Sequence, residues 1–169
     1  IDYLNWQNKL SEQNLNQPYL VLYSASSKDA NTTVVKREDL DLEFIIDKIT
    51  YWFSTENLEE AYYLSAILNS ETPNLMMKDF QSKGLFGARD VSKKILDIYY
   101  PRYDAEADSH RRLAELGQLC HERTAQYLRD FPPPSPLGGM QLGKLRLSIK
   151  RYLAKELKAI DVLVRKLIK

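Results

Sequence analysis

Two glycines and several basic residues lie together near the middle of the chain, in the stretch QSKGLFGARDVSKK (residues 81–94). Lysine and arginine replace the counterions of nucleic-acid phosphates, and glycine lets the backbone N–H groups approach a partner closely. An arginine can also bond a guanine edge through two hydrogen bonds. We therefore predict that this stretch contacts DNA. The residues that carry the prediction are Lys83, Gly84, Gly87, Arg89, Lys93 and Lys94.

Each of these residues also has a plainer interpretation. The paired lysines can form a solvated edge, Arg89 can pair with the adjacent Asp90, and Phe86 can pack into the core. A second basic and hydroxyl-rich stretch, SASSKDANTTVVKR, offers Lys28, Lys36 and Arg37 as further DNA contacts. Many ordinary turns have this composition, so both interpretations stay open for it.

The sequence offers no catalytic or metal site. The proline cluster DFPPPSP lacks the polar residue before the prolines and the aromatic residue after them that a motif for holding a flipped-out DNA base requires. The glycines of PLGGMQLG follow no predicted strand, so they do not fit a nucleotide-binding loop. His110 and His121 stand eleven residues apart without a closed set of ligands, and we expect His121 to be exposed. The single Cys120 excludes an internal disulfide, favours a buried small side chain and fits a cytoplasmic setting.

The elements that must position these residues are predicted by periodicity. Short runs rich in β-branched and aromatic residues indicate three or four antiparallel strands between about residues 18 and 53. A helix follows, with Asn57 as its cap and Glu60 three residues later, as in a capping box. A second helix is expected from Pro73 to a glycine cap at Gly84.

Beyond the central loop, KKILDIYYP (residues 93–101) reads as a strand that ends at its proline, and a helix is expected over residues 109–130. The prolines of FPPPSPLGG must break that helix. From there to the end, apolar residues at spacings of three and four predict one long amphipathic helix over residues 140–169. The fold class is thus α+β: a small antiparallel sheet with flanking helices, followed by long C-terminal helices.

Charge is distributed unevenly along the chain. Residues 139–169 carry nine basic and two acidic side chains, a net charge of +7, whereas the whole chain carries +1. Such asymmetry is typical of a polyanion contact, although a solvated basic face is the alternative. No apolar run is long enough for a membrane span, and the chain begins at Ile1, so we expect a fragment of a larger protein.

The order of three stretches, YYLSAILNS, SKGLFGARDVSKKILDIYYPRYD and HRRLAELGQLCHERTAQYL, resembles the target-recognition region of type IIG adenine-N6 DNA methyltransferases. It also resembles the specificity subunits of type I restriction–modification systems. The resemblance covers roughly residues 18–130. It departs from the family in one place, where IYYPRY has a single proline instead of a proline-rich end to the strand.

The resemblance implies four parts: a target-recognition-like α+β domain (1–104), a long helix (105–131), a Pro/Gly linker (132–139) and a basic amphipathic helix (140–169). It also implies sequence-specific recognition of double-stranded DNA in a restriction–modification or phage-defence system. An upstream methyltransferase domain of the same chain would bind S-adenosylmethionine, and this fragment would hold no cofactor. The alternative is a helical protein-interaction module without DNA contact, and the last helix offers a face for self-association.

Overall fold

The computed structural model describes residues 8, 10–24, 29–46, 50–80, 83–84, 87–88, 95 and 98–168. Three antiparallel strands form its main sheet: β1 (Tyr19–Ser24), β2 (Thr32–Lys36) and β3 (Thr50–Thr55). They lie in the order β2-β1-β3, so β1 is central. A second pair, β4 (Lys83–Gly84) and β5 (Gly87–Ala88), forms a separate ladder with the two glycines opposite each other.

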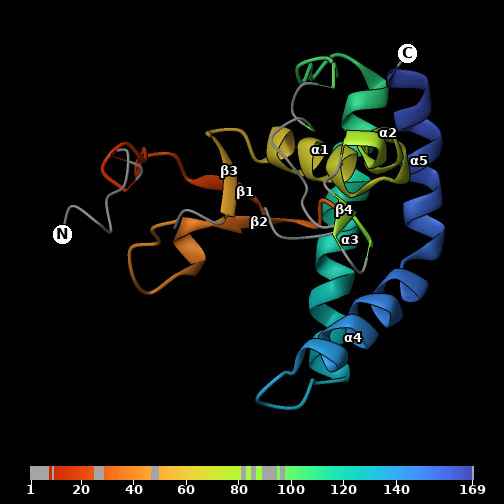
Figure 1. Cartoon of the computed structure of the whole chain (residues 1–169). Coiled ribbons are helices and arrows are strands. Elements are labelled where there is room, and N and C mark those ends of the chain that lie inside the picture. Colours follow the sequence, from red (N-terminus) through yellow and green to blue (C-terminus); the bar gives the residue numbers. More distant parts are fainter. Residues whose placement is uncertain are drawn as a thin grey trace.

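The helices pack on one side of the sheet (Figure 1). They are α1 (Leu58–Asn69), α2 (Glu71–Met76), α3 (Asp108–Asp130), α4 (Gly139–Tyr152) and α5 (Ala154–Leu167), with short 3-10 turns η2 (Arg37–Asp39) and η3 (Lys78–Phe80). Helix α1 contacts all three strands and also α3, and α5 runs beside α3. The α+β fold class, with a small antiparallel sheet and long C-terminal helices, is therefore confirmed.

The alternation of side chains along the strands divides the core between the two faces of the sheet. Val21 and Val34, which are paired across β1 and β2, face α1 and join the larger core with Ile67, Leu113 and Ile160. The opposite face carries a smaller cluster of Leu20, Leu22 and Ile46. Both faces of the sheet are thus apolar, as the β-branched and aromatic composition of the strands predicts.

Close packing of α1 on α3 depends on one glycine. A Cβ atom at Gly117 would collide with the carbonyl oxygen of Tyr62. Glycine therefore lets the two helix backbones approach in the centre of the core.

Local signals correctly predicted where α1 and α3 lie. The Asn57 side chain accepts hydrogen bonds from the N–H groups of Glu59 and Glu60, which makes it the cap of α1. Helix α3 spans Asp108–Asp130 and ends immediately before the proline cluster. Both observations confirm the predicted helices.

One predicted helix is shorter than expected, and one predicted strand is not seen at its described residues. The helix expected from Pro73 to Gly84 ends at Met76, because the buried Met77 tightens the chain by donating to Leu75 O and Pro73 O, and η3 follows. The strand expected over residues 93–100 is not seen at its described residues. Ile95 is instead fully buried in 3-10 conformation, and its carbonyl oxygen accepts a hydrogen bond from Tyr100 Oη.

The prediction of a single C-terminal helix over residues 140–169 is also wrong. The chain there forms two helices, α4 and α5, which meet at Leu153, whose φ of −93° and ψ of 10° depart from helical values. The Leu153 side chain is buried at 5% exposure, whereas α4 has no buried residue at all. The bend lets Leu153 enter the core and lets α5 pack on α3 while α4 turns away (Figure 1).

Candidate functional site

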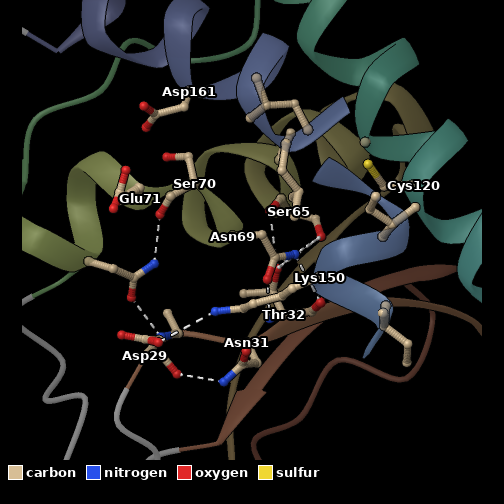
Figure 2. Close-up of a pocket in the computed structure, with 18 of the residues that line it drawn as sticks. Asp29, Asn31, Thr32, Ser65, Asn69, Ser70, Glu71, Cys120, Lys150 and Asp161 are labelled. Atoms are coloured by element: carbon tan, nitrogen blue, oxygen red, sulfur yellow. Dashed lines mark hydrogen bonds and ion pairs between the residues drawn. The ribbon is translucent and has the colours of Figure 1, made fainter. Parts of the chain in front are cut away.

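The start of β2, the α1–α2 corner, α3, α4 and α5 together line a cleft with a volume of about 780 Å³. Figure 2 shows its side chains converging from segments that are far apart in the sequence. Its charged and amide-bearing lining residues, together with Thr32, are Asp29, Asn31, Asn69, Glu71, Asn74, Lys78, Arg146, Lys150, Lys158, Asp161 and Arg165.

Two asparagines hold the β2 side of the cleft in place. Asn69 accepts from Thr32 N at 2.9 Å and donates to Thr32 O at 3.1 Å and to Thr32 Oγ1 at 2.7 Å. Asn74 accepts from Ala30 N at 2.7 Å and donates to Leu68 O and Ser70 O. These amides act as substitutes for a neighbouring strand, so they have little capacity left to bind a ligand.

On the helical side of the cleft, Asp161 attaches α5 to the start of α2. Its Oδ1 atom accepts from Thr72 N at 3.1 Å and from Thr72 Oγ1 at 2.9 Å. Its other oxygen pairs with Arg165 at 2.8 Å, and Arg165 also lies 3.6 Å from Glu71. The acidic side chains at this end of the cleft are therefore already engaged by protein groups.

Positive charge predominates in the cleft. Five cationic side chains line it, against three carboxylates. Lys150 forms an ion pair with Asp29, with 3.6 Å between Nζ and Oδ2 (Figure 2). Arg165 pairs with both Glu71 and Asp161. Within the described part of the chain, the remaining cations have no carboxylate partner; they are Lys78, Arg146 and Lys158. The cleft can therefore bind anions.

The α3 wall carries two groups, Cys120 and His121, whose pKa values are shifted by burial toward the uncharged form. Burial raises the pKa of the Cys120 thiol to about 11, so the thiol is protonated at neutral pH. Burial lowers the pKa of His121 below its ordinary value; the nearby Glu122 carboxylate opposes this shift, and Lys36 adds to it. His121 Nδ1 lies 3.4 Å from Tyr62 Oη and the residue is half-buried, so the expectation that it is exposed is wrong.

The predicted DNA contacts fall largely outside the described residues. Lys28, Arg89, Lys93 and Lys94 lie outside them altogether. Lys83, Gly84 and Gly87 are placed only by their backbone, in the β4–β5 ladder. The side chains of the stretch 81–94 therefore lie outside the described part of the chain, and the predicted DNA contacts there stay a prediction.

Lys36 and Arg37 are described, and both are half-buried. Arg37 donates from Nε to Gln17 O at 3.0 Å and from Nη1 to Phe44 O at 2.8 Å. Its guanidinium thus holds the segment after β2 against the segment before β1, a structural role that the prediction from sequence did not include.

The cleft residues themselves were not predicted as a site. The sequence did show the basic excess of residues 139–169, which contains four of the five cations. That these cations line the same cleft as Asn69 and Asp29 could not be seen from the sequence, because no local spacing connects them. The asparagines carried no signal beyond their place near the end of a predicted helix.

No group of three or more metal-ligating side chains occurs among the residues with described positions. Of the helices described, none has both the length and the hydropathy needed to cross a bilayer. A comparison with protein-family models and with curated protein sequences finds no match to this chain.

Proposed function

We propose that this chain is the sequence-specific DNA-recognition part of a larger, cytoplasmic, adenine-N6 DNA methyltransferase of a restriction–modification or phage-defence system. The order of its sequence stretches supports this assignment to the family. In the proposal, an upstream domain of the same protein binds S-adenosylmethionine and carries out the methyl transfer. The fragment contributes DNA binding.

One observation carries this proposal: the unpartnered cations Lys78, Arg146 and Lys158 lie around one cleft, beside Lys150 and Arg165. Exposed cations without carboxylate partners repel one another and are stabilised when an anion lies among them. The phosphates of a DNA strand provide such anions at regular spacing, and each contact releases condensed counterions. The rim of the cleft therefore positions a DNA backbone, whereas base recognition belongs to the stretch 81–94.

Fluorescence anisotropy with a labelled duplex, measured at several salt concentrations, tests this proposal on the 169-residue chain. The test variant replaces Lys78, Arg146 and Lys158 by glutamine. Since each phosphate contact contributes about 0.9 to the slope of log affinity against log salt, losing three contacts should lower the slope by roughly 2.7. Absence of salt-dependent binding by the unmodified chain at low salt would overturn the proposal.

A matched control separates contact from net charge. Arg102, Lys155 and Lys166 are also exposed, and none of them lines the cleft. Replacing these three by glutamine removes the same total charge and should leave most of the slope intact. Equal losses from the two triple variants would show that DNA responds only to total charge and not to the cleft.

A second candidate function, a helical protein-interaction module, is favoured by α4. This helix has no buried residue, and it exposes Met140 at 78% and Leu147 at 50%. Light scattering after size exclusion tests this alternative with Met140 and Leu147 replaced by serine. A dimer that becomes a monomer, together with no DNA binding, would favour the assembly function.

A further inference from the structure

The outer edge of β2 opens toward the cleft. In an antiparallel pair, alternate residues of a strand turn their N–H and C=O groups toward the neighbour or away from it. Arg37 N donates to Pro18 O at 2.9 Å, which places Arg37 in the inward set with Thr33 and Val35. The backbone groups of Thr32 and Val34 must therefore point outward, away from β1.

Side chains cover the first part of this edge. Asn74 bonds Ala30 N, and Asn69 bonds both backbone groups of Thr32. Among the described residues, no side chain takes the corresponding place over Val34, although Val34 lines the cleft. Val34 is only 4% exposed, so its outward N–H and C=O lie in a sheltered position where unpaired backbone groups are costly.

The surroundings of Val34 suit a small amphipathic ligand. Apolar residues of the cleft lie on several elements, among them Ala66, Ile149, Leu153 and Ile160. The unpartnered Arg146 and Lys158 lie on the helical side. The volume of about 780 Å³ falls within the range of roughly 300–1,000 Å³ that is typical of small-molecule sites. A DNA duplex is too wide to enter such a cleft, whereas a single nucleotide unit fits.

We infer that the cleft binds a mononucleotide-sized organic phosphate. Its hydrogen-bonding heterocycle pairs with the outward N–H and C=O of Val34, and its phosphate lies between Arg146 and Lys158. Free nucleotides and nucleotides within a single strand share this chemistry. The inference goes beyond DNA recognition and does not depend on it, because a mononucleotide would bind in the absence of DNA.

Isothermal titration with adenosine 5′-monophosphate, adenosine and inorganic phosphate tests the inference on the full chain, together with amide NMR spectra. The monophosphate should bind more tightly than either of its parts, and it should shift the Val34 amide resonance. Replacing Arg146 and Lys158 by glutamine should weaken binding by about twofold to fivefold per side chain, as for exposed ion pairs. Replacing Lys155 and Lys166 removes equal charge outside the cleft and should leave binding unchanged.

Thermal unfolding of each variant confirms that it folds. Shifts confined to lysine and arginine side chains, with the Val34 amide unmoved, would overturn the inference, as would equal binding of phosphate and monophosphate. A single-stranded oligonucleotide that displaces the monophosphate would identify a strand nucleotide as the source. Failure to displace it would identify a free nucleotide.

Discussion

Replacing Asn69 by alanine should weaken the fold at the wall of the cleft. The substitution removes the two hydrogen bonds between the Asn69 side chain and the Thr32 backbone: Thr32 N donates to Asn69 Oδ1 at 2.9 Å, and Asn69 Nδ2 donates to Thr32 O at 3.1 Å. A hydrogen bond of this kind contributes about 0.5–1.5 kcal/mol net, so two of them contribute about 1–3 kcal/mol. Alanine has the higher helix propensity, by up to about 0.7 kcal/mol, but Asn69 is the last residue of α1, where this gain is smaller.

The expected net loss in the free energy of unfolding is therefore about 1–2 kcal/mol. Urea unfolding measures it, and hydrogen exchange of the Thr32 amide provides a local readout. The control is Gln118→Ala on the exposed face of α3, which should change stability by less than about 0.5 kcal/mol.

A second substitution separates the two bonds. Asn69→Asp keeps an acceptor for Thr32 N but replaces the donor with a carboxylate facing Thr32 O. The Thr32 amide should then stay protected although the protein is destabilised. If Asn69→Ala unfolds within about 0.5 kcal/mol of the original chain and leaves Thr32 exchange unchanged, the amide does not hold β2.

Three further outcomes are expected. In the full-length parent, Lys93→Ala should lower the slope of log DNA affinity against log salt by roughly one unit. Arg89→Ala should instead weaken binding by about 1–3 kcal/mol on the cognate site only. If both variants keep the original affinity and slope, the stretch 81–94 is not part of the DNA interface. Calorimetry should detect no S-adenosylmethionine binding by this fragment, and micromolar affinity would contradict the proposed division of the parent protein. Because burial lowers the folded-state pKa of His121 below its ordinary 6.5, protonation favours the unfolded chain. Stability should therefore fall as pH drops through about 6.5, and His121→Gln should reduce that loss; an identical pH profile for both proteins would refute this role.

Elements defined by nearby residues were predictable from the sequence. Asn57 caps α1 through groups two and three residues away, and the proline cluster ends α3 wherever the rest of the chain lies. The strand region was recognisable because its composition suits a pleated sheet that is apolar on both faces. In each case the deciding interaction is local, or is repeated along the element.

The bend at Leu153 and the cleft depend on contacts between distant residues. The apolar spacing of the tail continues through Leu153, so periodicity alone predicts one helix. The link from Thr72 to Asp161 joins residues 89 positions apart, and that from Lys150 to Asp29 joins the tail to the strand region. Basic residues in the tail were visible as a group, but their shared cavity was not.

The joint between α4 and α5 determines where the cations of α4 lie. Tyr152, the last residue of α4, packs against Tyr127 with 5.1 Å between ring centroids, and the Arg123 guanidinium lies 4.6 Å from the Tyr152 ring centre. Arg123 also pairs with the buried Glu156 in the first turn of α5. These contacts attach both sides of the bend to α3.

Arg146 lies about two turns before the bend at Leu153, and Lys150 lies within the last turn of α4. A change of bend angle would therefore move both of them relative to Asp29 and Val34. The Lys150–Asp29 pair joins an exposed lysine to a half-buried aspartate at 3.6 Å, and a solvent-accessible pair of this length contributes little stability. The width of the cleft is therefore controlled mainly by the aromatic and ionic contacts at the joint, which line no part of the cleft themselves. An anion bound between α4 and α5 would favour the bend angle that brings its cations together, because binding energy can select among conformations only through such differential contacts.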